Sequence, residues 1–195
     1  MVSGVEIRAI RPEDIQQAVD LDRRGGWDGR VDPDPALQQE MFARAARAEA
    51  AGDPLWVPNV WEGLTVAGEI DRALAFWVAA ETGSSENLLG TVGVQGPSAR
   101  GDIPPQLVAE HWWLDPDVVE LVRLRVDRSL HRRGIGAALS QAAIDLAREH
   151  GYRRMILNTS APQLPAQGLY RSLGFQIVAR SYLGTYELVW HEFAL

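Results

Sequence analysis

The first part of the chain shows two kinds of spacing between apolar and polar residues. Residues 5–10 (VEIRAI) alternate between the two types, which predicts a strand. A helix is predicted from residue 12 to about residue 24, because Pro12 suits a first helical turn and Gly25 follows its end. A second helix is expected over residues 34–51.

The middle of the chain predicts a β-hairpin. Residues 74–80 (LAFWVAA) and 88–95 (LLGTVGVQ) are both strand-like, and the polar segment 82–87 between them is a turn. Residues 96–116 are rich in proline, so we predict a long loop, which is typical of functional or mobile segments.

The second half gives the clearest pattern. A Val- and Leu-rich strand at 118–126 is followed by a helix at 134–150 and a buried-type strand at 154–159. This order implies a parallel pair of strands inside an otherwise antiparallel sheet. Further elements are predicted at 165–173 (helix), 176–180 and 186–193 (strands). No repeat or linker divides the chain, so we expect one α/β domain over residues 1–195.

Composition removes several classes of function. The chain has no cysteine, which excludes disulfides, thiolate metal sites and cysteine nucleophiles. Its net charge of -7 argues against nucleic-acid binding. All 19 basic residues are arginine, which excludes a lysine Schiff base and a Walker P-loop. The four histidines are isolated and show no metal-ligand spacing, so we expect no metal site.

The sequence contains no signal for membrane insertion. Residues 1–13 lack the apolar core of a signal peptide, and no stretch approaches the length of a transmembrane helix. We therefore expect a cytoplasmic protein without a membrane partner.

The segment 128–137 (RSLHRRGIGA) links the strand at 118–126 to the helix at 134–150. Gly134 and Gly136 allow a close backbone approach to a ligand, and the helix start adds its positive end. Five arginines lie in or just before this segment: Arg123, Arg125, Arg128, Arg132 and Arg133. The pattern indicates a site for a diphosphate, although a tightly packed helix start with solvated arginines would look the same.

A dinucleotide-binding fold explains this loop less well. The sixth position of its Gly-x-Gly-x-x-Gly pattern holds Leu139, and Gly134 follows Val126 by eight residues instead of immediately.

Two motifs carry a family resemblance. Residues 131–136 (HRRGIG) resemble motif A of the GNAT superfamily of N-acetyltransferases, written Q/R-x-x-G-x-G/A, with His131 in the first position. Residues 163–175 (QLPAQGLYRSLGF) resemble motif B, with Gln163 where asparagine is common. The stretch is also similar to the camello-like branch, which includes cysteine-conjugate N-acetyltransferases.

The resemblance implies a mixed, mainly antiparallel sheet of about seven strands flanked by about four helices. It places the coenzyme-binding core at about 118–175 and makes acetyl-coenzyme A (acetyl-CoA) the co-substrate. By position in the motifs, the coenzyme contacts would be Leu124, Val126, His131, Arg132, Arg133, Gly134, Ile135, Gly136, Ala137, Asn158, Gln163 and Tyr170.

The resemblance also suggests two catalytic residues. Glu120 matches the base glutamate of some family members, and on an unbulged strand it would share a face with Val122, Leu124 and Val126. An ordinary strand-end carboxylate is the alternative. Tyr170 matches the motif B tyrosine that protonates the leaving thiolate, but it also continues the apolar face of its helix.

The sequence says least about the acceptor of the acetyl group and the residues that bind it. Trp27, Asp28, Trp112 and Trp113 lie in predicted loops where family members build the acceptor pocket, although surface turns explain them as well. We expect a small amine or amino-acid-like metabolite, ahead of a peptide N-terminus or an aminoglycoside-type drug. A non-catalytic acyl-CoA sensor with the same fold is the alternative function. A homodimer is plausible.

Overall fold

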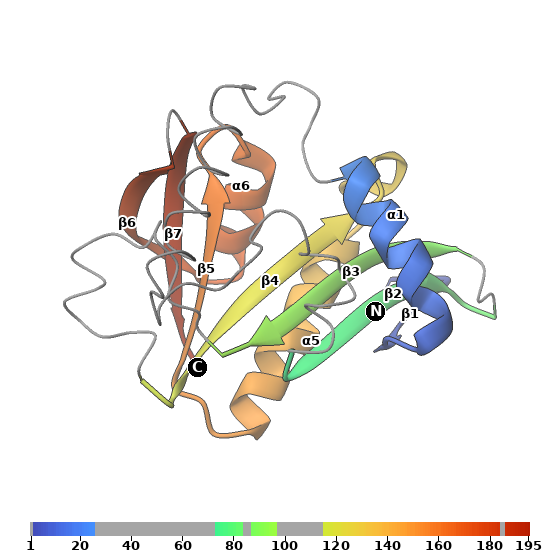
Figure 1. The fold of residues 1–195 in the computed structure, drawn as a ribbon, viewed down its shortest axis with the longest axis horizontal. Coiled ribbons are helices and arrows are strands. Elements are labelled where there is room, and N and C mark those ends of the chain that lie inside the picture. Colours follow the sequence, from blue (N-terminus) through green and yellow to red (C-terminus); the bar gives the residue numbers. More distant parts are fainter. Residues whose placement is uncertain (1, 26–72, 84–86, 97–114, 184–185) are drawn as a thin grey trace, which may run out of the picture.

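The computed structural model describes residues 2–25, 73–83, 87–96, 115–183 and 186–195. They form a seven-stranded sheet in the order β1-β2-β3-β4-β5-β7-β6 (Figure 1). The strands are β1 Val5–Ala9, β2 Ala75–Glu81, β3 Leu88–Gln95, β4 Val118–Val126, β5 Arg154–Ser160, β6 Gln176–Leu183 and β7 Tyr186–Ala194. Only β4 and β5 pair in parallel. The mixed, mainly antiparallel sheet of the sequence prediction is therefore confirmed.

Helices occupy the positions that the sequence predicted, within two or three residues at each end. They are α1 Ile15–Gly25, α5 Ile135–Glu149 and α6 Leu164–Ser172, with short 3-10 turns η1 Pro12–Asp14 and η3 Arg128–Leu130. The helix expected over residues 34–51 lies outside the described residues, and so do residues 97–114 of the loop expected over residues 96–116.

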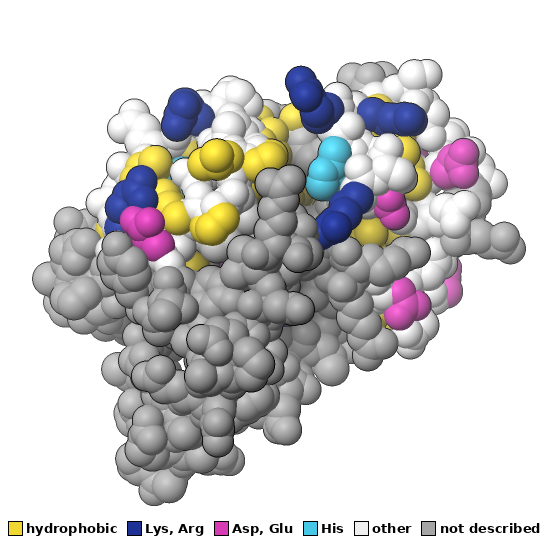
Figure 2. All heavy atoms as spheres, turned by 90° about the horizontal axis from the view of Figure 1, so that it is seen from above, with side chains coloured by type: hydrophobic (Ala, Val, Ile, Leu, Met, Phe, Trp, Pro, Cys, Tyr) yellow, Lys and Arg dark blue, Asp and Glu magenta, His cyan; other side chains and the backbone are white. Residues whose placement is uncertain are grey.

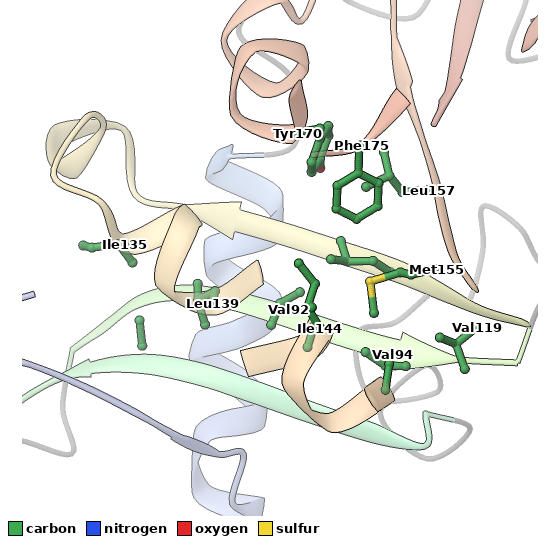
Figure 3. Close-up of a cluster of buried hydrophobic side chains, with 14 residues drawn as sticks. Val92, Val94, Val119, Ile135, Leu139, Ile144, Met155, Leu157, Tyr170 and Phe175 are labelled. Carbon is green, nitrogen blue, oxygen red and sulfur yellow. The ribbon is translucent and has the colours of Figure 1, made fainter. Parts of the chain in front are cut away.

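The sheet carries α5 on one face and α1 on the other (Figure 1). Under α5, a buried cluster joins apolar side chains of β3, β4 and β5 to the helix; it includes Val92, Leu121, Leu139, Ile144 and Met155 (Figure 3). On the other face, Ala18 of α1 packs on Phe76 and Val78 of β2. The period of two in the strands and of 3.6 in α5 produces these two layers.

An ion pair fixes α1 to the edge of the sheet. The Arg8 guanidinium of β1 donates to both carboxylate oxygens of Asp14, at 2.6 and 2.9 Å. Asp14 is fully buried, and it also accepts from the backbone N–H of Arg11 at 2.8 Å. These bonds, led by the one from Arg8, hold the pKa of Asp14 below its usual value.

Strand β4 contains a bulge that the sequence did not predict. Between two paired positions, β3 has one residue, Val92, whereas β4 has two, Arg123 and Leu124. Arg123 has a φ of 52°, in the left-handed region that non-glycine residues rarely adopt.

The bulge corrects one expectation about Glu120. Glu120 shares a face with Val122 but not with Leu124 and Val126, because the extra residue reverses the alternation of side chains. Leu124 and Val126 pack against the cluster under α5. Val122 instead lies beside Phe76 of β2, since a Cβ built on Gly93 would approach both side chains.

None of the helices in the described ranges is long and apolar enough to cross a bilayer.

Candidate functional site

Strands β4 and β5 separate at the centre of the sheet. Their parallel pairing covers only Val118–Glu120 of β4 and Arg154–Ile156 of β5. Beyond this point β4 follows β3 as far as Val126, and β5 follows β7 as far as Ser160 (Figure 1). The carboxyl ends of the two strands therefore diverge, and the segments that follow them, η3–α5 and α6, flank the opening.

The loop between β4 and α5 is held in a defined shape by side chains. The Asp127 carboxylate accepts from the backbone N–H of Ser129 at 2.9 Å and so caps η3. The His131 ring then returns to β4, where its Nε2 lies 3.1 Å from the carbonyl oxygen of Val126. The first part of the loop is thus held against the end of β4 before α5 begins.

Left-handed residues direct the backbone at the start of α5. Arg132 has a φ of 64° and Gly134, the N-cap of α5, has a φ of 84°. Left-handed residues placed among right-handed ones turn successive backbone N–H groups toward one side. The first N–H groups of a helix also have no hydrogen-bond partner within the helix. This backbone can hold an anion.

The two glycines of the loop have different roles. A Cβ at Gly136 would lie 3.2 Å from Leu169 Cδ2 of α6 and 3.6 Å from Val126 Cγ2. Gly136 therefore permits close packing of α5 on α6 and β4. Gly134 needs glycine for its φ, and within 4 Å its Cβ would meet only Val2 among the described residues, at 3.6 Å.

The charge around the loop fits a diphosphate. Arg128, His131, Arg132 and Arg133 are all exposed. The space-filling view shows basic side chains near a histidine on one face of the molecule, together with some acidic side chains (Figure 2). In a chain of net charge -7, this is a local concentration of positive charge next to a helix N-terminus. The residues present therefore fit the phosphate groups of coenzyme A.

Glu120 lies where β4 and β5 part. It is 2% exposed, its pairing neighbour on β5 is Ile156, and its carboxylate accepts from Gln95 Nε2 at 3.2 Å. Asn158 of β5 lies on the same face, since the intervening Leu157 points into the cluster under α5. This face is the one that α1 covers.

Tyr170 reaches toward the same opening from the other face. Its ring belongs to the buried cluster, next to Phe175 (Figure 3). The Tyr170 ring centroid lies 5.8 Å from that of Phe175 and 5.5 Å from that of His191. Burial raises the pKa of Tyr170 to about 12, and the positive charge of Arg125 acts against this rise. The packing role expected from the sequence is therefore present, and the phenol is protonated at neutral pH.

Gln163 makes a contact that the sequence did not indicate. Its side-chain oxygen accepts from Thr159 Oγ1 at 2.6 Å, which joins the start of α6 to the end of β5. Gln167 Nε2 donates to the carbonyl of Ala161 at 2.7 Å and secures the same turn. Neither Thr159 nor Gln167 was singled out, because polar residues at a strand end or in a helix carry no specific signal.

Several predicted contacts are restricted to the main chain or fall outside the described residues. Ile135 is 2% exposed and its side chain packs in the core, so only its backbone is available to a ligand. Trp27, Asp28, Trp112 and Trp113 lie outside the described residues. Among the residues that are described, no three His, Asp or Glu side chains are grouped so as to hold a metal ion.

Comparison with known proteins finds related sequences. The family model described as "Acetyltransferase (GNAT) family" matches residues 38–175. Human N-acetyltransferase 8B is 36% identical over 107 residues, which are 55% of this chain and 40% of that protein. Rat N-acetylaspartate synthetase is 30% identical over 106 residues, which are 54% of this chain and 29% of that protein. The matched stretch thus covers less than half of either relative. Both agree with the camello-like resemblance.

Solved structures share the fold over nearly the whole chain. The protein smu.2055 from Streptococcus mutans superposes with a TM-score of 0.64 at 17% identity, covering 97% of this chain and 98% of that one. The putative acetyltransferase yncA from Salmonella typhimurium, solved with its cofactor acetyl-CoA, has a TM-score of 0.59 at 16% identity and covers 99% and 95%. Identities this low support the fold alone.

Proposed function

Because the chain belongs to the acetyltransferase (GNAT) family, we propose that it transfers an acetyl group from acetyl-CoA directly to a primary amine. The observation that carries this proposal is the loop before α5. Its left-handed residues, its helix N-terminus and its exposed basic side chains can hold an anion at the carboxyl end of β4, beside the opening between β4 and β5. A sensor that binds acyl-CoA without turnover is the alternative.

The coenzyme contacts follow from this geometry. The main chain of residues 131–137 holds the diphosphate, with charge supplied by Arg132 and Arg133. The backbone of Leu124 and Val126, beyond the end of the β4–β5 pairing, holds the pantetheine arm and the thioester carbonyl. Preorganised donors of this kind stabilise a transition state by about 3 kcal/mol. Asn158 and Gln163 line the β5 side of the opening.

Two residues on opposite faces of the sheet carry the proton transfers. Acetyl-CoA supplies the acetyl group as a thioester. Glu120 accepts the proton that the attacking amine must lose, from the face that α1 covers. Tyr170 donates a proton to the departing sulfur from the α5 face. Burial raises the pKa of the Tyr170 phenol to about 12, so the phenol carries the proton that it donates, and the Arg125 charge acts against this rise.

We propose an amino-acid-like or other small primary amine as acceptor. The support is that relatives at 30% identity are named N-acetylaspartate synthetase. Trp27, Asp28, Trp112 and Trp113 are the proposed acceptor residues. The single domain over residues 1–195, the cytoplasmic location and the homodimer stay predictions.

The test is a thiol-release assay with a panel of amines. The purified chain is mixed with acetyl-CoA and, in separate reactions, free amino acids, simple alkyl amines, a peptide with a free N-terminus and an aminoglycoside. We expect amine-dependent release of free coenzyme A and a matching N-acetylated product by mass spectrometry. Coenzyme binding without release by any amine would favour the sensor.

A further inference from the structure

The bulge in β4 lies in the strand that the proposed function assigns to the thioester. Arg123 and Leu124 are the two β4 residues of the bulge, and Arg123 has a φ of 52°. The backbone that follows, from Leu124 to Val126, is the segment proposed to hold the pantetheine arm. Whatever fixes the bulge therefore fixes the direction of those main-chain groups.

Thr91 of β3 makes a side-chain contact to this bulge. Its hydroxyl donates to the carbonyl oxygen of Arg123 at 3.0 Å, and the side chain is buried, with 2% exposure. A bulge takes backbone groups out of the regular ladder, and buried carbonyls need a donor. The hydroxyl provides one at the residue with the unusual φ. A valine of the same shape would provide none.

Glycines on β3 show how closely the two strands fit here. A Cβ at Gly90 would lie 2.7 Å from the Arg125 carbonyl oxygen, and a Cβ at Gly93 would lie 3.1 Å from Val122 Cγ2. Real Cβ atoms do not approach a backbone oxygen that closely. The bulged segment is therefore pressed against β3 on both sides of Thr91, and the hydrogen bond acts on a segment with little freedom to move.

We infer that Thr91 is a positioning residue for the transfer reaction: its hydroxyl fixes the β4 bulge and thereby aims the Leu124–Val126 backbone at the acyl-pantetheine arm. The inference rests on the proposed function. In this inference Thr91 acts through the β4 backbone and not by touching a substrate. Thr91 lies on the same face of the sheet as Glu120, whereas the phosphate loop begins beyond the end of β4. We therefore expect Thr91 to affect only the binding of the pantetheine and thioester part of the coenzyme.

The test uses Thr91→Val, with Thr91→Ser as the matched control that keeps the hydroxyl. Calorimetric titration measures two probes: acetyl-CoA, and 3′-phosphoadenosine 5′-diphosphate, which carries the phosphates but no pantetheine. For Thr91→Val we expect about tenfold weaker binding of acetyl-CoA, as for the loss of one buried hydrogen bond, and unchanged binding of the nucleotide. The kcat should also fall, and Thr91→Ser should restore both values.

Three results would overturn the inference: wild-type acetyl-CoA affinity and kcat in Thr91→Val, equal weakening of both probes, or a Thr91→Ser variant as impaired as Thr91→Val. Thr91→Ala, which is smaller and creates no clash, replaces Thr91→Val if that variant does not fold, with the same expected losses. If the wild-type chain itself does not bind acetyl-CoA, the proposed function fails first and the inference falls with it. Failure of the Thr91 variants alone leaves the proposed function standing.

Discussion

The amino-terminal part of the sheet and its central part use their polar residues in different ways. In the first, from β1 to β3, polar side chains pair with other groups of the protein: Arg8 binds the buried Asp14, and Gln17 of α1 accepts from the Leu88 backbone N–H at 3.2 Å. In the second, from β4 to α6, side chains such as those of Asp127 and His131 shape a loop whose backbone and arginines remain exposed.

This difference separates scaffold from site. A closed set of hydrogen bonds adds stability and specifies one packing, whereas exposed, preorganised donors are useful only to a ligand. Substitutions in the amino-terminal part should therefore change the free energy of unfolding, and substitutions in the central part should change binding or turnover.

Replacing Gly134 by aspartate should abolish coenzyme binding. The new carboxylate would repel the phosphates at the N-terminus of α5, and the φ of 84° is unfavourable for a side chain by about 1 kcal/mol. Gly83→Asp is the matched control, since Gly83 has a φ of 81° and a Cβ there would meet none of the described residues within 4 Å. Calorimetry with acetyl-CoA should detect no binding to Gly134→Asp and normal binding to Gly83→Asp. Retained binding in a folded Gly134→Asp variant would show that the phosphate site is misplaced.

Replacing Asp14 by alanine should destabilise the fold by about 3 kcal/mol, because Arg8 would be left without its buried partner. Urea unfolding measures this change, and acetyl-CoA affinity should stay the same. The exposed Arg180–Glu187 pair is the control, and Glu187→Gln should cost less than about 1 kcal/mol. A loss of affinity equal to the loss of stability would contradict the separation of scaffold and site.

The same ion pair predicts a pH dependence of stability. The pKa of Asp14 is lowered in the folded chain, so its contribution is fully present above the unfolded pKa of about 3.9. The contribution of Asp14 to the free energy of unfolding is lost as the pH falls through the lower pKa that Asp14 has in the folded chain. The difference in unfolding free energy between wild type and Asp14→Asn should therefore shrink in acid below about pH 4. A difference that stays constant would argue against the pair.

Replacing Tyr170 by phenylalanine should lower kcat by about 100-fold, a typical loss for a general acid. The KM for acetyl-CoA and the unfolding midpoint should change little, because the ring remains against Phe175 and His191. Steady-state kinetics and thermal unfolding separate the two roles of the side chain. An unchanged kcat would leave Tyr170 as a packing residue only.

Replacing Glu120 by glutamine should lower kcat about tenfold near neutral pH, since glutamine keeps the shape but cannot accept the proton. The difference in kcat between wild type and Glu120→Gln should become smaller as the pH rises, because a larger fraction of the acceptor amine is then unprotonated. A pH–rate profile measures this trend. If the ratio of wild-type kcat to Glu120→Gln kcat does not change with pH, or if kcat is not lowered at all, Glu120 is not the base. The proton would then go to water or leave without a dedicated base.

Much of the fold could be predicted because it follows from periodic patterns. The strands at 88–95 and 118–126 were placed with their observed bounds, and the β4–β5 parallel pair followed from the order of elements. The diphosphate loop was visible because glycines, arginines and a helix start occur together. These features arise from residues that are close together in the sequence, so they can be read from the sequence itself.

The details that shape the site depend on contacts between distant residues. In the sequence Arg123 looks like any other strand residue, and only the β3–β4 register shows that it lies in a bulge, where its φ is left-handed. The face expected for Leu124 on an unbulged strand therefore does not apply. Thr91 lies 32 positions from the carbonyl that it contacts. The β3–β4 register brings these groups together, and no local pattern reports that register.

Calorimetric titration of the pure chain with acetyl-CoA and then with free coenzyme A is the most direct test of the proposed coenzyme site. Both should bind with micromolar affinity, because they share the phosphates and pantetheine arm that the α5 loop and β4 hold. If a folded chain binds neither, the loop is only the start of a helix, and the proposed acetyl transfer is contradicted.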